Sequence, residues 1–208
     1  MVSYSSYIHL LGMSFILFAI SSFAANTTNP PKTLGPIIEA TCWSATSKPN
    51  YNLCIHSLRA NNEALESYWD SLPNISVKIT LNNITNTNRY INNLLKITKD
   101  AFLKEILQSC HENYGLATKS IQSSFPYFFS YDFGFIMDIL KSAQKQILSC
   151  DAEVGKSRGL RNYLTPRNKL SIQLLTISAD LVGLLDPDTP MKKKHPTSPP
   201  KKNKTYLL

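Results

Sequence analysis

Four cysteines that follow an apolar N-terminal stretch constrain this chain more than any other feature. Cys42 and Cys54 are separated by 11 residues, and Cys110 and Cys150 by 39. An even number of cysteines in an exported chain predicts a disulfide framework, because bridges form and persist on the oxidising secretory route. Four cysteines allow three connectivities and the sequence leaves the choice open. Their spacing and helical phase favour two sequential bridges.

The N-terminal stretch at residues 10–25 is almost wholly apolar or small. It is shorter than the roughly 20 apolar residues that span a bilayer, which favours a removable signal peptide. Ser22-Phe23-Ala24 offers small residues for cleavage, so we expect a signal peptide at residues 1–24 and a flexible segment at 25–34. A buried N-terminal helix is the alternative. No later stretch is apolar for long enough to cross a membrane, so no membrane partner is expected after cleavage.

The net charge of +8 is concentrated towards the C-terminus. Residues 186–208 carry six lysines and five prolines against two aspartates. This composition cannot bury enough apolar surface to offset the entropy of folding, so we predict a disordered basic tail. Such a tail could adhere to an anionic polymer such as pectin or to a membrane surface, or it could serve solubility or sorting. The core lacks interleaved basic and aromatic residues, so no nucleic-acid partner is expected.

The first part of the remaining chain is expected to form a helical hairpin. A short helix is predicted from Ile37 to Cys42, and a second from Tyr51 to Arg59. Lys48-Pro49-Asn50 is expected to form the turn between them, because of its proline and asparagine. Each helix carries one cysteine, so a bridge between them would staple the hairpin.

Four longer segments show apolar residues at alternating spacings of four and three, which is typical of helices packed in a bundle. Asp100 is the expected N-cap of the second segment, Phe125-Pro126 is expected to end it, and the last helix is expected from about Arg167 to Leu185. Asn88 lies on the same stripe as the apolar residues of the first segment. It is interpreted either as a core polar group with a hydrogen-bond partner or as the sign of a local break in the helix. The sequence thus predicts an all-α fold, an up-down four-helix bundle preceded by a disulfide-stapled N-terminal helical hairpin, in one domain at residues 35–185. The stripes are Val77, Leu81, Ile84, Ile91 and Leu95; Leu103, Leu107, Cys110, Tyr114, Ala117 and Ile121; Ile136, Leu140, Ala143, Ile147 and Cys150; and Leu170, Leu174, Ile177, Leu181 and Leu184.

The segments around the cysteines carry recognisable motifs. They are GPIIEATC at residues 35–42, YNLCIHSL at 51–58, LQSCHENYGLA at 107–117 and SCDAE at 149–153. Together with the closing helix, they resemble the plant invertase and pectin methylesterase inhibitor family, especially its pollen-allergen-like branch. The resemblance implies bridges Cys42–Cys54 and Cys110–Cys150 and a protein that blocks another enzyme and is not itself one.

The resemblance also offers two binding surfaces. Invertase inhibitors of the family insert a Pro-Lys-Phe loop into the target, but Pro126-Tyr127-Phe128 lacks the lysine and comes too early, so this motif is not carried over. The aromatic run at residues 125–135 is interpreted as core packing at a helix corner, with an exposed contact patch as the alternative. Pectin methylesterase inhibitors use outward helix faces, while a polar helix face is most often simply solvated. The corresponding partner-binding residues here are Glu105, Gln108, Glu112, Lys119 and Gln122.

Few residues could perform catalysis. Only His56 and His111 lie outside the predicted leader and tail, and no metal-ligand spacing or phosphate-binding loop occurs. Cys110 beside His111 would suggest a nucleophile only if the thiol were free, and a core disulfide is favoured. We expect no catalytic residue, metal or cofactor, and we interpret His111 as a surface residue.

Four N-x-[ST] sequons are glycosylation candidates in an exported chain. They are Asn26, Asn74, Asn83 and Asn203. Asn74 and Asn83 are about 180° apart on a helix, so both cannot face water. Asn74 follows Pro73 and is interpreted as the helix cap, whereas Asn83 is the expected mid-helix glycan site.

These features predict a secreted inhibitor of a wall carbohydrate-active enzyme. Pectin methylesterase is the first target, blocked by covering its substrate cleft. Cell-wall or vacuolar invertase is the alternative target, and a non-inhibitory allergen-like, storage or defence bundle is the second alternative. The expected location is the apoplast, with the vacuole as the alternative.

Overall fold

The structure is a computed structural model that describes residues 35–187, where all regular elements are α-helices and no strand occurs. The predicted signal peptide, the segment 25–34, Asn26, Asn203 and all but two residues of the basic tail lie outside the described residues. The helices are α2 (Gly35–Ala45), α3 (Lys48–Arg59), α4 (Asn62–Leu65), α5 (Leu72–Ile97), α6 (Ala101–Phe129), α7 (Phe133–Val154) and α8 (Arg158–Val182).

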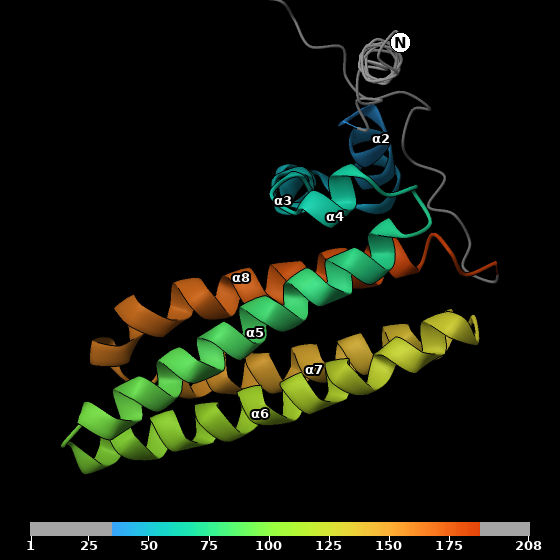
Figure 1. Cartoon of the computed structure of the whole chain (residues 1–208). Helices are drawn as coiled ribbons and strands as arrows, with labels where there is room; N and C mark the ends of the chain where they lie inside the picture. The colour runs from blue at the N-terminus through green and yellow to red at the C-terminus, as the bar shows by residue number, and fades with distance from the viewer. Residues whose placement is uncertain (1–34, 188–208) are drawn as a thin grey trace, which may run out of the picture. The chain divides into compact units, whose positions relative to one another are not determined.

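The four long helices, α5 to α8, form a bundle with short connections (Figure 1). Each helix packs against the next, and α8 returns to pack against α5. The side chain of Asp100 accepts a hydrogen bond from the Leu103 N–H at 2.8 Å, and Asp132 accepts one from the Phe135 N–H at 3.1 Å. These caps satisfy backbone donors that have no partner within their helices. The predicted up-down four-helix bundle is confirmed, and so is the cap at Asp100.

The predicted helical hairpin is formed by α2 and α3. A disulfide joins Cys42 to Cys54, whose Cα atoms lie 5.9 Å apart, and Glu39 pairs with Arg59 on the exposed side. The hairpin packs on the beginning of α5, next to α4, and on the end of α8. At this place it closes a second, smaller core. That core includes Ile38, Leu58, Leu72, Ile75, Ile177 and Leu181.

The stripes predicted for α6 and α7 are buried, apart from half-buried Leu103. The stripe of α8 is only partly correct, because Leu170 is 36% exposed and α8 instead turns Asn168 and Ser171 inward. Leu160 and Leu164 are also buried in the main core. They were not predicted because α8 begins nine residues before the expected Arg167.

Three predicted helix boundaries are wrong, and each involves proline. Lys48-Pro49-Asn50 opens α3 and is not a turn, since proline suits the first helical turn, where its missing N–H has no partner to lose. Pro126 does not end α6, and Pro166 lies inside α8. An internal proline removes one helical hydrogen bond. Apolar residues near each proline pack on the core, and this packing keeps both helices continuous despite the missing hydrogen bond.

The contact between α5 and α8 contains a buried polar seam. Ser178 of α8 lies 2.8 Å from the hydroxyl oxygens of both Ser76 and Thr80 on α5, and Thr80 also donates to the Leu174 carbonyl. All three hydroxyls are buried and satisfied. The apolar stripes gave no sign of this seam, because its residues fall between the apolar positions.

Candidate functional site

The five residues predicted to bind a partner form one exposed strip on α6. Glu105, Gln108, Glu112, Lys119 and Gln122 are all exposed, on the side of α6 opposite the buried stripe. At 1.5 Å per residue the strip is about 25 Å long. The Gln108 amide donates to a Glu112 carboxylate oxygen at 2.8 Å, which links two of its members.

An exposed leucine lies within this strip. Leu116 is 51% exposed, between Glu112 and Lys119 in helical order. A single exposed leucine is common on protein surfaces, but at this position it adds apolar contact area to the middle of a polar strip. Leu116 was missed because only polar residues were considered for this face. The sequence signal that could have identified Leu116 is its position outside the apolar stripe of α6, where residues recur at spacings of four and three. We name Glu105, Gln108, Glu112, Leu116, Lys119 and Gln122 the α6 strip.

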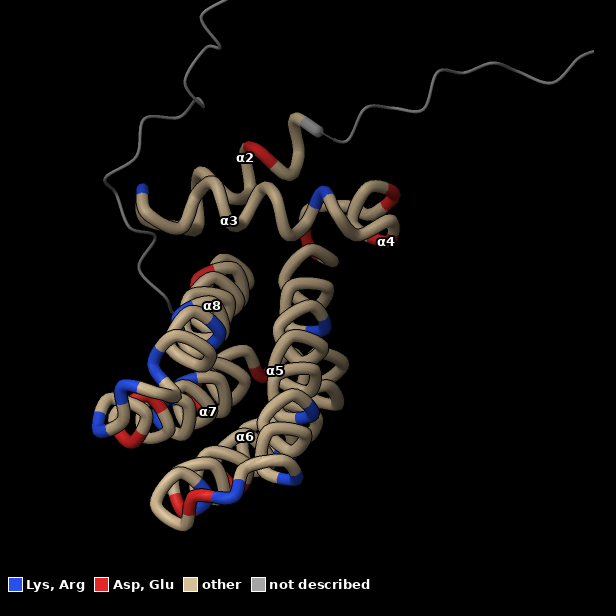
Figure 2. Tube along the Cα trace, turned by 90° about the vertical axis from the view of Figure 1, so that its left-hand side faces the viewer, with Lys and Arg blue, Asp and Glu red and all other residues tan. Residues whose placement is uncertain are grey.

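A shallow hollow of about 460 Å³ lies at one end of the strip, where α5 passes into α6. Leu95 and Ala101 give it apolar lining, and Lys104, Glu105 and Gln108 give it polar lining. Figure 2 shows both acidic and basic residues at this end of the bundle. The structure thus brings Glu105 and Gln108 into one concave region, while Lys119 and Gln122 lie further along the helix.

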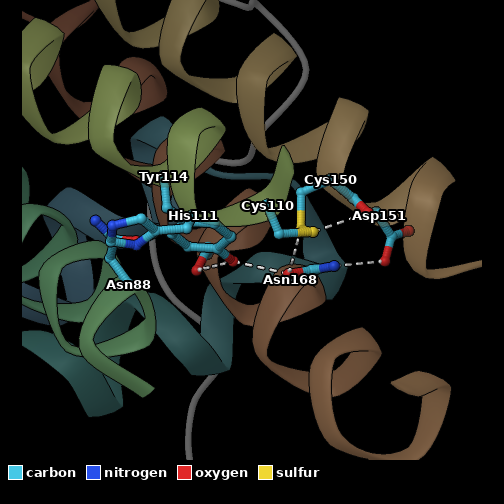
Figure 3. The surroundings of a disulfide bond; sticks show 8 residues. Asn88, Cys110, His111, Tyr114, Cys150, Asp151 and Asn168 are labelled. Carbon is cyan, nitrogen blue, oxygen red and sulfur yellow. Dashed lines mark hydrogen bonds between the residues drawn. A yellow bond between two sulfur atoms is a disulfide. The ribbon is translucent and has the colours of Figure 1, made fainter. Parts of the chain in front are cut away.

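The α6 strip is held by rigid contacts on the opposite side of the helix (Figure 3). A disulfide joins Cys110 to Cys150 of α7 with Cα atoms 4.7 Å apart. The Tyr114 hydroxyl donates to Asn168 Oδ1 at 2.8 Å, and the Asn168 amide donates to Asp151 at 3.0 Å. Three helices are therefore tied together beneath the strip.

The pKa of Tyr114 reports how enclosed this network is. Burial raises it to about 12, with a smaller raising effect from Asp151. A hydrogen bond to Ser171 and the positive charge of Arg167 oppose the shift. The phenol therefore stays protonated and acts as a hydrogen-bond donor across the physiological range.

His111 is not a free surface residue, which corrects the sequence-based interpretation. It is half-buried, and its Nδ1 lies 2.7 Å from Asn88 Oδ1 on α5. This contact also settles the two alternatives for Asn88, which is a satisfied polar group in an unbroken helix. The pair links α5 to α6 beside the strip.

The aromatic run at the α6–α7 corner combines both of its predicted roles. Phe125, Tyr127, Phe128 and Phe133 pack against the main core. Phe129 and Tyr131 are 85% and 77% exposed, and Tyr131 has a φ of 58°, in the left-handed region that non-glycine residues adopt infrequently. The corner is therefore anchored by one set of rings and presents another to solvent.

The two sequons on α5 lie differently from what the sequence predicted. Asn74 is not the cap, because Ser71 is the N-cap and Asn74 falls in the first helical turn. Asn83 is not an outward position. It is half-buried, and its side-chain oxygen accepts a hydrogen bond from Ser171 of α8 at 2.8 Å. The position of Asn83 differs because α5 buries a polar side against α8 in addition to its apolar stripe, whereas that of Asn74 differs because α5 begins two residues before it, at Leu72.

The described residues contain no cluster of His, Cys, Asp and Glu side chains that could hold a metal ion. All four cysteines are in disulfides. In the same range, no helix has the length and apolar character required to span a bilayer.

The described residues thus form a disulfide-tied helical bundle with an exposed side-chain strip on α6. The family model "Plant invertase/pectin methylesterase inhibitor" matches residues 36–181. The chain therefore belongs to this family, whose members are inhibitors and not enzymes. Both disulfides that the resemblance implied are present.

Relatives of known sequence carry invertase or fructosidase in their names. The chain is 26% identical over 152 residues to a "Putative invertase inhibitor" of Platanus orientalis, which covers 72% of this chain and 89% of the relative. It is 33% identical over 110 residues to "Cell wall / vacuolar inhibitor of fructosidase 2" of Arabidopsis thaliana, covering 52% of this chain and 59% of the relative.

The fold is also similar to solved structures of pectin methylesterase inhibitors. A mutant form of such an inhibitor from Arabidopsis superposes with a TM-score of 0.61 at 17% identity, covering 70% of this chain and 94% of the other. Another, from Arabidopsis thaliana, gives 0.55 at 16% identity, with 72% and 95% covered. At these identities the likeness concerns the fold alone.

Proposed function

We propose that this protein inhibits a plant pectin methylesterase by laying the α6 strip across the substrate cleft of that enzyme. The main observation behind this proposal is the strip itself, which is an exposed polar face of α6 that includes Leu116. The Cys110–Cys150 bridge and the Tyr114 network fix the helix beneath it. Preorganisation of this kind reduces the entropy lost on binding.

The position of α6 in the bundle is compatible with this surface. The main contacts of α2 and α3 with the bundle are with α5 and α8 (Figure 1). The hairpin therefore leaves the outer side of α6 open to a partner. The strip has charges of both signs, Glu105, Glu112 and Lys119, which favour an oriented, salt-sensitive encounter.

The conformation of Pro126-Tyr127-Phe128 argues against insertion of this segment into an invertase active site. These residues lie in the last turns of α6, and the Tyr127 and Phe128 rings pack against the core. An inserted loop would have to leave these contacts. Together with the missing lysine, this supports pectin methylesterase as the first candidate target.

An acid invertase or fructosidase is the second candidate target. The names of the curated relatives favour it, and the exposed Phe129 and Tyr131 at the corner offer a contact surface. The same names support an exported protein, which we place in the apoplast, with the vacuole as the alternative. The lysine-rich tail is the proposed contact with pectin.

The test is an inhibition assay of the purified, oxidised protein against a pectin methylesterase and an acid invertase. Leu116→Asp should weaken pectin methylesterase inhibition at least about tenfold, because a charge buried without a partner at the centre of the interface should cost more than about 1.4 kcal/mol, which corresponds to a tenfold change in affinity. Leu148→Asp on α7 is the matched control. It replaces a leucine of similar exposure, 48%, outside the strip and should change inhibition less than about twofold.

The two targets are separated by a corner variant. Phe129→Ser should leave pectin methylesterase inhibition unchanged and should weaken inhibition only if invertase is the target. Inhibition of invertase alone would transfer the assignment to the second candidate. Inhibition of neither enzyme would favour the non-inhibitory bundle, and equal effects of the two leucine variants would exclude the α6 strip as the binding surface.

A further inference from the structure

A second hollow, of about 370 Å³, lies between the first turn of α5 and the α6–α7 corner. Its volume falls within the range of about 300–1,000 Å³ that is typical of small-molecule sites. Its lining combines the aromatic rings of Phe128, Phe129 and Tyr131 with the polar side chains of Glu63, Asp70 and Asn74. Aromatic rings beside carboxylates and amides suit a sugar, which has C–H faces that cover rings and hydroxyls that hydrogen-bond at its edges.

Asn74 is the asparagine of the sequon Asn74-Ile75-Ser76. It lies in the first turn of α5, only partly buried, and lines the hollow. Its side-chain amide makes no hydrogen bond to any other described residue. The amide nitrogen, to which an N-glycan is attached, is therefore not committed to the fold.

The neighbouring sequon at Asn83 presents the opposite situation. Its side-chain oxygen is held by Ser171, a fully buried residue of α8. A glycan on Asn83 would have to leave from the edge of the α5–α8 contact, where the bundle is closed. Of the two sequons within the described residues, Asn74 is the one whose side-chain amide makes no hydrogen bond in the fold, and Asn83 is the one whose side chain is held by another helix.

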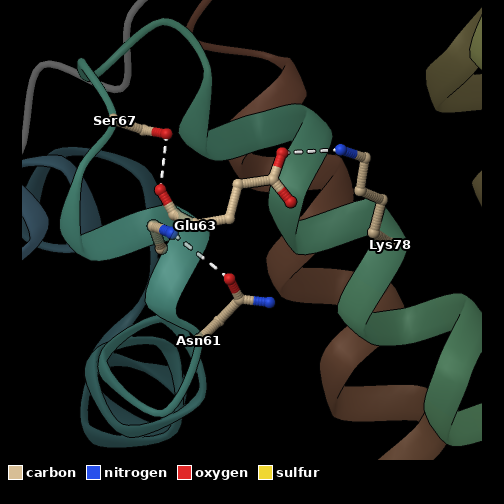
Figure 4. Close-up of polar contacts among 5 residues, drawn as sticks. Asn61, Glu63, Ser67 and Lys78 are labelled. Carbon is tan, nitrogen blue, oxygen red and sulfur yellow. Dashed lines mark hydrogen bonds and ion pairs between the residues drawn. The ribbon is translucent and has the colours of Figure 1, made fainter.

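Polar contacts join α4 to the start of α5, and these two helices contribute Glu63 and Lys78 to the lining of the hollow (Figure 4). Lys78, one turn beyond Asn74 on α5, pairs with Glu63 of α4 at 2.6 Å. The Asn61 side chain caps α4 by accepting from the Ala64 N–H at 3.2 Å. The hollow is therefore lined both by the tied α4–α5 segment and by the anchored aromatic corner.

From this arrangement we propose that Asn74 carries an N-glycan and that its first sugars cover Phe129 and Tyr131. An N-glycan is a bulky, solubilising surface group. Two strongly exposed rings on a secreted protein are an association hazard unless they are covered or used. The glycan fills this place without occupying the centre of the α6 strip, because Leu116 and Phe129 are 13 positions apart, or about 20 Å along the helix. The near end of the strip, Gln122, is seven positions from Phe129, or about 10 Å.

The proposal requires passage through the secretory route, and it fits pectin methylesterase as the target, because a glycan over Phe129 and Tyr131 would block their use as a contact with invertase. Full-length protein should be expressed with its own leader in plant leaf tissue and purified from the secreted fraction. Glycopeptide mapping, with enzymatic release in ¹⁸O-labelled water, should show occupancy at Asn74 and none at Asn83. Asn74→Gln should abolish this signal, and Asn83→Gln, the matched control, should not change it.

Coverage of the rings is measured by hydroxyl-radical footprinting of the glycosylated protein and the Asn74→Gln variant. Oxidation of Phe129 and Tyr131 should rise at least about threefold in the variant. Tyr163 on α8, which is exposed and lies away from the hollow, should be oxidised equally in both. Pectin methylesterase inhibition should be the same for both proteins, so a failed inhibitor assay would leave this proposal intact.

An unoccupied Asn74, or occupancy at Asn83 in its place, would overturn the assignment of the site. Occupancy at Asn74 with unchanged oxidation of Phe129 and Tyr131 would show that the glycan extends into solvent and would overturn the covering role. Increased oxidation of Tyr163 as well would show general loosening of the variant and would contradict a local effect.

Discussion

Replacement of Tyr114 by phenylalanine should destabilise this protein far more than the loss of one oxygen atom suggests. The Tyr114 hydroxyl is the hydrogen-bond donor to Asn168 Oδ1, and it also lies 3.4 Å from Ser171 Oγ. Cys150 Sγ lies 3.8 Å from the same Asn168 oxygen, but a disulfide sulfur has no proton to donate. Tyr114→Phe therefore leaves a fully buried acceptor without a donor.

The expected magnitude follows from this loss. A buried polar group without its partner costs about 1–3 kcal/mol, and Asn168 is fully buried. A domain of this size loses roughly 2–4 °C of Tm per kcal/mol, so a cost of about 2 kcal/mol should lower Tm by roughly 4–8 °C. The Cys110–Cys150 bridge keeps α6 and α7 together, so the fold should survive and the loss should be measurable.

The assay is equilibrium unfolding in urea with both disulfides oxidised, supported by calorimetry. Tyr163→Phe is the matched control, because Tyr163 is an exposed tyrosine of the same bundle and should change stability by less than about 0.5 kcal/mol. A loss below about 0.5 kcal/mol for Tyr114→Phe would refute the reasoning. It would mean that water or a rotated Asn168 amide satisfies the acceptor.

Three further predictions test the packing of the core, the loss of stability at alkaline pH and the contribution of the two disulfide bridges. Leu107→Ala should cost about 2–5 kcal/mol by opening a cavity in the main core, whereas Glu105→Ala on the strip should stay within about 0.5 kcal/mol; equal shifts in thermal unfolding would contradict the helical phase. Burial raises the pKa of Tyr114 from 10.0 to about 12, so its contribution is complete below about pH 10 and should fall by about 2–3 kcal/mol as the pH rises to about 12; urea unfolding of the Phe variant should lack this decline. The loop closed by the α6–α7 bridge spans 40 positions and that of the α2–α3 bridge 12, so replacing the α6–α7 bridge by alanines should cost about 1 kcal/mol more in the chain-entropy model. An equal cost in chemical denaturation would count against that model here.

The helical bundle, the stapled hairpin and the exposed side of α6 could be predicted from the order of the amino acids alone. Apolar stripes with 4-3 spacing place Leu107 and Ile147 inside the core because burial of apolar surface dominates the choice of helix face. The same helical phase places Glu105 and Glu112 on the solvent-exposed side of α6. These features depend on residues within one helix, so they can be read locally.

The distribution of the buried polar residues and the tolerance of proline within helices depend instead on how the helices pack together. Asn83, Asn168 and Ser178 are turned inward because a partner on another helix satisfies each of them, and that partner is distant in sequence. Pro126 and Pro166 remain within helices because packing on neighbouring helices outweighs a lost backbone bond. The aromatic corner and the hollow beside Asn74 likewise exist only when α4, α5 and α6 are assembled. Long-range satisfaction of polar groups is a property of the packed chain, and no local pattern encodes it.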